Sequence, residues 1–225
     1  TNQSTAFFEY ELEFESGLES AVSGSTLPDL EDEEVEIMGT TYTIVDTTVS
    51  TSTNELTLTL LGGAVYDILG EGETKTYTID GKDFEVTALI IEDVTPATVT
   101  FEINGEITKQ LGDSQTTTLD DGTLVGVSDI VLNEAGEPGS GDIVEMYLGA
   151  TKLVLKDTDY TDTTFSQNVE INNEDIINAL VQIIAFEQYA GTELEITTIK
   201  YRLSADALNG DDVWVEEGHG VREYL

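Results

Sequence analysis

The chain has 225 residues and carries 46 Asp and Glu against 8 Lys and Arg, a formal net charge of -38 at pH 7. Charge of this sign repels phosphate, so nucleic acid and anionic membrane are poor partners, and we expect neither nucleic-acid binding nor membrane insertion. Salt or bound cations must screen the charge when the chain folds. The 39% of hydrophobic residues argue against simple disorder, and the absence of cysteine excludes disulfides, thiolate metal sites and a cysteine nucleophile.

The first predicted element is a strand over residues 8–15, in which apolar and acidic residues alternate. Phe8, Tyr10 and Phe14 share one face, and four glutamates share the other, as in a half-buried strand. Four like charges on one strand face repel acidic neighbours, so this strand needs cations or a partner along its outer face. Threonine, with 32 copies, is β-branched and suits exposed strands elsewhere in the chain.

Three similar segments follow, and each predicts a strand, a tight turn and a second strand. Their turn glycines are spaced by 42 and 41 residues, and the last two follow an aspartate, as type I′ hairpin turns favour. A period near 40 residues can indicate propeller blades, but three units are too few for a closed propeller, so duplicated hairpins in a sandwich are favoured. The segments are 35–44, 76–86 and 116–127, with turns at Gly39, Gly81 and Gly122.

Each hairpin is expected to be followed by another strand, which a glycine just beyond its last residue ends. These strands are 56–61, 98–103 and 143–148. Residues 152–156 predict a short strand, and 193–203 predict a long alternating one. The stretch 176–189 fits a helix as well as a strand. A strand from Ala179 is favoured, because both flanks have β patterns. No run of residues is long and apolar enough for a membrane span.

Six segments of the chain carry a resemblance to a known family: 8–20, 30–44, 59–64, 77–86, 147–153 and 218–225. In these segments the chain resembles the S-layer and related cell-surface proteins of archaea, particularly of small-genome lineages. This resemblance implies antiparallel β-sandwich domains, Ig-like and with little helix, in a secreted coat that self-assembles. It also implies that the coat is calcium-dependent and glycosylated, as such coats often are.

Two domains are expected, one nested in the other as such surface proteins often show. Residues 71–157 hold five of the eight cations and predict an inserted sandwich. Residues 1–70 and 158–225 then combine into an outer, discontinuous sandwich. Two consecutive domains are the alternative. Because the chain starts at Thr1 and ends without an obvious stop, we expect a processed chain or a piece of a longer protein.

Signals for catalysis are weak, and we expect no enzyme activity. His219 is the only histidine and lies between two glycines. Nucleophile elbows, phosphate loops and dinucleotide fingerprints are absent from the sequence. Glycoside hydrolysis needs two positioned carboxylates, but a sequence with 46 of them does not single out a pair.

Calcium is the candidate ligand, and no cofactor is required. Ca²⁺ takes six to eight oxygen ligands, and Asp157, Asp159 and Asp162 place three carboxylates in one loop. Each acidic run can equally be a solvated turn, because Asp is common in turns. The other acidic candidates are 31–34, Asp120–Asp121 and Asp211–Asp212.

Two further residues are candidates for surface chemistry. Asn2 begins an Asn-Gln-Ser triplet, the only N-glycosylation sequon. Trp214 lies in a short alternating segment, where it could stack against a sugar or simply pack in a core.

The sequence therefore predicts a structural cell-surface protein, extracellular, with copies of itself and divalent cations as its partners. An extracellular adhesin or carbohydrate-binding module is the alternative, with a groove lined by Trp214 and tyrosines. A halophilic protein of any function, whose acidity is solvent adaptation, is a third reading. A hydrolase that uses a carboxylate pair is a fourth.

Overall fold

The structure, a computed structural model, describes residues 6–79, 81–133, 141–166, 168–176, 179–189 and 191–204. In these ranges the chain forms strands and one short 3-10 helix, and every strand pair is antiparallel. The predicted all-β class with little helix is confirmed. No helix of the described ranges is long and apolar enough to cross a membrane.

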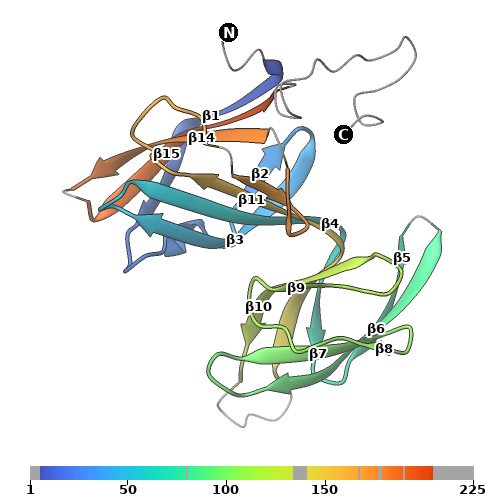
Figure 1. Ribbon diagram of the computed structural model, residues 1–225. Helices are drawn as coiled ribbons and strands as arrows, with labels where there is room; N and C mark the ends of the chain where they lie inside the picture. Colours follow the sequence, from blue (N-terminus) through green and yellow to red (C-terminus); the bar gives the residue numbers. More distant parts are fainter. Residues whose placement is uncertain are drawn as a thin grey trace, which may run out of the picture.

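The strands form three sheets (Figure 1). The first has the order β1-β15-β14, and the third has the order β5-β6-β7-β8. The second sheet has the order β13-β12-β11-β4-β3-β2, and β10 pairs with β11 and with β9. The elements are β1 Ala6–Ala21, η1 Pro28–Leu30, β2 Glu34–Ile37, β3 Thr40–Ser50, β4 Glu55–Gly70, β5 Thr74–Ile79, β6 Lys82–Glu92, β7 Thr98–Ile103, β8 Glu106–Ile107, β9 Thr116–Thr118, β10 Leu124–Val131, β11 Ile143–Asp157, β12 Val169–Ile171, β13 Glu174–Asp175, β14 Ala179–Gln188 and β15 Glu193–Ser204.

Most of the predicted strands and hairpins are confirmed. The pairs β2–β3, β5–β6 and β9–β10 are the three predicted hairpins, and Gly39, Gly81 and Gly122 hold φ values of 79°, 81° and 89° at or next to their turns. The ambiguous stretch forms β14 from Ala179, as favoured, and the strand predicted over 98–103 is β7.

Two predicted strand ends are wrong, because the glycines at 62–63 and at 149 lie inside strands. β4 continues from Glu55 to Gly70, and β11 joins the predicted strands 143–148 and 152–156 into one. A Cβ on Gly62 would lie 2.8 Å from the carbonyl oxygen of Thr41, and Gly149 has φ +67°. These glycines permit close backbone approach and a local distortion within a continuous strand pair, which is a different use of glycine from strand termination.

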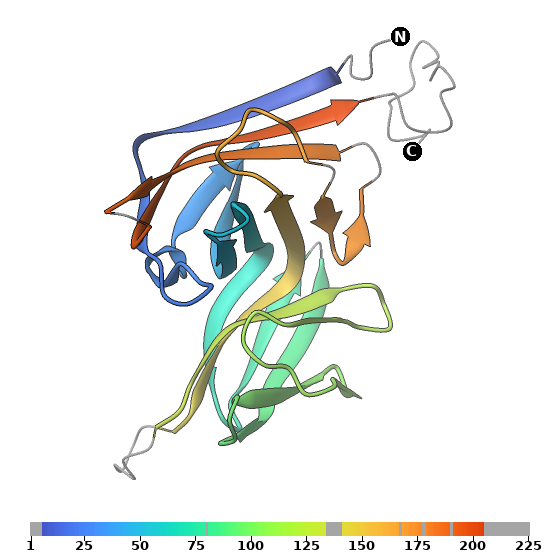
Figure 2. The ribbon, with the colours of Figure 1, turned by 60° about the vertical axis from the view of Figure 1, so that its left-hand side comes forward.

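The long β4–β11 pair connects two lobes with separate hydrophobic cores (Figures 1 and 2). The terminal lobe has a core drawn from residues 27–60 and 153–199, and the central lobe has a core drawn from residues 69–148. On β4, Leu56, Leu58 and Leu60 enter the terminal core, whereas Leu69 enters the central one. Even and odd positions point to opposite sides of a strand, so the two cores lie on opposite faces of this ribbon.

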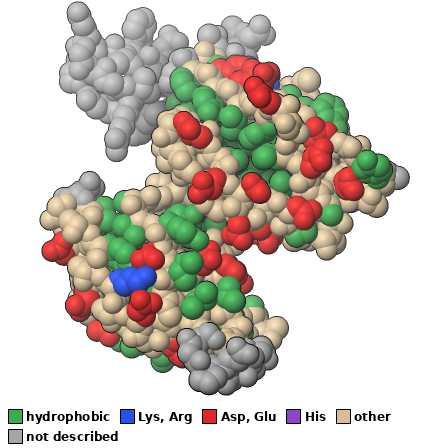
Figure 3. Space-filling model, turned by 180° about the vertical axis from the view of Figure 1, so that it is seen from behind, with side chains coloured by type: hydrophobic (Ala, Val, Ile, Leu, Met, Phe, Trp, Pro, Cys, Tyr) green, Lys and Arg blue, Asp and Glu red, His purple; other side chains and the backbone are tan. Residues whose placement is uncertain are grey.

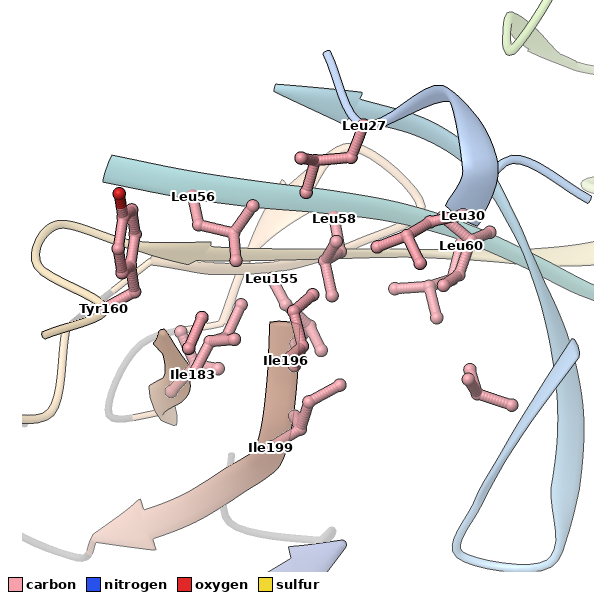
Figure 4. Packing of buried hydrophobic residues seen from close by; sticks show 14 of the residues in the cluster. Leu27, Leu30, Leu56, Leu58, Leu60, Leu155, Tyr160, Ile183, Ile196 and Ile199 are labelled. Carbon is pink, nitrogen blue, oxygen red and sulfur yellow. The ribbon is translucent and has the colours of Figure 1, made fainter. Parts of the chain in front are cut away.

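The terminal core lies between the first sheet and the second. Figure 4 shows leucines of β4 and β11 pointing toward Ile196 and Ile199 of β15. Leu56, Leu58 and Leu60 are 0% exposed, and full burial of such a side chain contributes about 1.5–3 kcal/mol. The division into 1–70 plus 158–225 and 71–157 stays a prediction, because β4 and β11 contribute to both cores.

Candidate functional site

The predicted calcium loop contains one buried carboxylate and two surface ones. Asp157 is 1% exposed; its Oδ1 accepts hydrogen bonds from Ser166 Oγ at 2.9 Å and the Asp159 N–H at 3.0 Å, and its Oδ2 accepts the Ile183 N–H at 2.6 Å. Asp157 therefore connects β11 to β14 through hydrogen bonds. Its position in an acidic loop of the sequence did not indicate this structural role.

Asp159 and Asp162 each organise a turn of their own. Asp159 Oδ1 accepts from the Thr161 hydroxyl at 2.6 Å and the Thr161 N–H at 3.1 Å, and these bonds lower the pKa of Asp159. Asp162 Oδ1 accepts the Thr164 N–H at 2.6 Å. Across the described ranges, no three acidic or histidine side chains are grouped so that they could hold a metal ion. The use of these three aspartates as calcium ligands stays a prediction.

The other predicted residues have different surroundings. Asp121 pairs with Lys82, which lowers the pKa of Asp121 to about 2, and the neighbouring Asp120 N–H donates to the Glu106 carboxylate at 3.1 Å. From the run 31–34, Glu31 and Asp32 line a cleft between the lobes, and the other two glutamates of the run are exposed. Five candidates lie outside the described residues: Asn2, Asp211, Asp212, Trp214 and His219.

The acidic face predicted for residues 8–15 receives cations from the chain itself. Arg202 Nη2 lies 2.7 Å from Glu9 Oε2, and Lys200 Nζ lies 2.7 Å from Glu11 Oε1. Both cations belong to β15, in register opposite their glutamates on β1. Further along the same pair, Glu19 lies opposite Glu195, and like charges in that position repel.

A cleft with a volume of about 330 Å³ lies where the two lobes meet. The terminal lobe supplies Glu31 and Asp32 from the segment between η1 and β2, and Val45 and Asp46 from β3. The central lobe supplies Asp113 and Ser114 from the segment between β8 and β9, and Ser128 and Asp129 from β10. Ser114 Oγ donates a hydrogen bond to the Val45 carbonyl and so connects the two walls.

Two β-bulges shape the walls of this cleft. The β3–β4 register shifts between Ile44 and Asp46, and the β10–β11 register shifts between Val127 and Asp129. Val127 and Ile130 point into the central core, so the extra residue of the bulge directs Ser128 and Asp129 toward the opposite face. Bulges re-aim side chains in this way and are common beside functional sites.

The carboxylates of the cleft disfavour one another's ionisation. Burial raises the pKa of Glu31, and nearby Asp46, Asp32, Asp129 and Asp113 raise it further. Burial also raises the pKa of Asp113, with Asp129 adding to the effect. Burial raises the pKa of Asp46, and this is opposed by the Thr47 N–H and by the charge of Lys152. Five clustered carboxylates make the cleft strongly negative at neutral pH.

An apolar groove opens beside the terminal core. Its volume is about 140 Å³, and Tyr10, Tyr42 and Tyr201 line it together with aliphatic side chains and Met38. Burial raises the pKa of Tyr42 and of Tyr201, and Tyr10 Oη donates a hydrogen bond to the Glu36 carbonyl at 3.4 Å. Figure 3 shows hydrophobic side chains gathered on one face of the terminal lobe, with acidic side chains around them.

Comparison of the chain with protein-family models, with curated proteins and with solved structures finds no match. Sequence reasoning missed Asp46, Asp113, Ser128 and Asp129. The sequence contains a signal for both β-bulges of the cleft. Ile44–Val45 and Ser128–Asp129 interrupt the apolar–polar alternation of their strands, as a bulge does.

Proposed function

We propose that this chain is a structural, non-catalytic subunit of an extracellular coat of the S-layer kind. Its copies assemble with one another, and divalent cations neutralise the acidic surfaces that meet. The β4–β11 pair supports this role, because unbroken strand pairing between two cores gives a stiff building block. A stiff subunit transmits lattice contacts without losing them to hinge motion.

The observation that carries the proposal is the distribution of charge along β1. Glu9 and Glu11 have cationic partners within the chain, whereas Glu19 faces Glu195. β1 is an edge strand of 16 residues. Exposed edges invite pairing with another chain, and charged residues discourage it. Cations that neutralise the glutamates would remove this barrier, so edge contacts between copies would form when divalent cations are present.

Sedimentation of the chain with increasing Ca²⁺ tests this proposal. The unmodified chain should form larger species with millimolar Ca²⁺ and return to the starting species with a chelator. A Glu19→Lys variant places a cation opposite Glu195 and should weaken the calcium dependence of assembly. Glu85→Lys makes the same change on an exposed position of β6 and serves as the control. A chain that stays monomeric in calcium would contradict the proposal.

A second candidate is an extracellular adhesin or carbohydrate-binding module, and the tyrosine-lined groove favours it. Tyrosine offers an apolar ring with a polar tip, and Tyr42 and Tyr201 would present both to a sugar ring or to one apolar side chain. A glycan array tests this candidate. Binding that Tyr42→Ala abolishes and Tyr66→Ala retains would support it, since Tyr66 does not line the groove.

A further inference from the structure

The apolar groove of the terminal lobe opens directly onto the core of that lobe. It is lined from the first sheet and from the second, and its volume is about 140 Å³. Three of its lining side chains, Ile37, Leu155 and Ile199, are buried members of the terminal core, whereas Met38 is 50% exposed. Protein cores are close-packed, so an apolar side chain that entered the groove would extend the packing of this core.

The last described strand ends beside the groove. β15 ends at Ser204, three residues after Tyr201, which lines the groove. Residues 205–225 follow in the sequence and lie outside the described residues. An extended chain spans about 3.3–3.6 Å per residue, so residues 205–212 reach about 25 Å. The groove therefore lies within reach of the segment that begins at residue 213.

The composition of this terminal segment matches the groove. Of the longer stretches outside the described residues, which are 1–5, 134–140 and 205–225, only the last contains aromatic side chains. Trp214 lies there between two valines, and Asp212 and Glu216 stand two residues to either side of it. In an extended segment these two carboxylates would share the face of the indole ring.

We propose that segment 211–217 docks on the groove of the same chain, with the indole ring of Trp214 inside it. A buried tryptophan removes about 150–250 Å² from water, and this burial drives the docking. The hydroxyls of Tyr42 and Tyr201, which line the groove, donate to the carboxylates that flank the ring, because a tyrosine hydroxyl is a donor at neutral pH. The docking does not depend on coat formation, and a sugar can enter the groove only after the segment leaves.

Intrinsic fluorescence tests the proposal, because Trp214 is the only tryptophan of the chain. At concentrations where light scattering shows monomers, the full chain should emit at shorter wavelength than the urea-unfolded chain and should resist quenching by acrylamide. Met38→Asn removes an apolar lining side chain at φ 52°, a conformation that asparagine tolerates. It should shift the emission to longer wavelength and increase the quenching. Val94→Asn is the control, since Val94 is 48% exposed and does not line the groove, and it should change neither.

Thermal midpoints give a second measurement, because side chains in contact have non-additive effects on stability. Trp214→Ala should lower the midpoint, and Met38→Asn should lower it less in that variant than in the unmodified chain. Val94→Asn should have the same effect in both. Equal quenching of the folded and unfolded chains would overturn the proposal, as would additive effects of Met38→Asn and Trp214→Ala. An emission that shifts on dilution would also overturn it, because the ring would then lie on another copy.

Discussion

The carboxylate of Asp157 accepts the backbone N–H of Ile183 at 2.6 Å, which joins the end of β11 to the middle of β14. β11 belongs to the second sheet and β14 to the first, so this bond crosses the terminal core. The same carboxylate accepts from Ser166 Oγ and from the Asp159 N–H. A buried carboxylate with three donors stabilises the packing of the two sheets.

Replacing Asp157 with Ala should therefore destabilise the fold. The substitution leaves the buried Ile183 N–H and the Ser166 hydroxyl without their acceptor, which costs about 3 kcal/mol. For a chain of this size that corresponds to a fall of roughly 6–12 °C in the thermal midpoint, measurable by circular dichroism. Asp159→Ala is the control and should change the thermal midpoint far less, because its hydrogen bonds lie in an exposed turn. A loss that appears only in the presence of calcium would instead indicate a metal ligand.

Gly62 is predicted to be intolerant of any side chain. A Cβ there would lie 2.8 Å from the Thr41 carbonyl oxygen and 2.9 Å from Tyr42 Cδ1, so neighbouring β3 would have to move. Gly62→Ala should cost about 1–3 kcal/mol of unfolding free energy in denaturant titrations. Gly141→Ala, where a Cβ meets nothing within 4 Å, should be neutral or slightly stabilising. Equal effects for both variants would contradict close packing at Gly62.

The pair of Glu11 and Lys200 should behave as a charge pair on the sheet surface. Lys200→Glu places like charges opposite each other and should cost about 0.5–1 kcal/mol, less at high salt. The swapped double variant Glu11→Lys/Lys200→Glu should recover most of the loss. Thermal unfolding at low and high NaCl measures the loss of stability in Lys200→Glu and its recovery in the swapped variant. If the swap recovers nothing, packing of the lysine stem outweighs its charge.

The cleft carboxylates should destabilise the fold at neutral pH when divalent cations are absent. Their folded pKa values are raised, for Glu31, Asp46 and Asp113 alike, so their protonated forms are favoured by folding. Stability from these groups is fully present below their unfolded pKa values near 4 and is lost as pH rises through the folded ones. In chelator, Asp113→Asn should raise the thermal midpoint at pH 7 and have little effect at pH 3. A lower midpoint at pH 7 would contradict the raised pKa.

The strands were predictable because alternation and turn glycines are local signals. Residues 8–15, the turn at Gly81 and the strand from Ala179 all follow from such patterns. The continuous β4 and β11 were not predictable, since the same Gly62–Gly63 sequence suits a strand end and a close approach between strands. The roles of Asp157 and Ser128 depend on which strands pack beside them. A composition with 46 acidic residues does not distinguish a buried carboxylate from a solvated one.

Imaging of the purified full chain by negative-stain electron microscopy, with millimolar Ca²⁺ and then with excess chelator, tests the central claim most directly. The account predicts ordered sheets or tubes in calcium that disperse in chelator, with NaCl of equal ionic strength giving no ordered assemblies. Dispersed particles under all three conditions would contradict a coat-forming role.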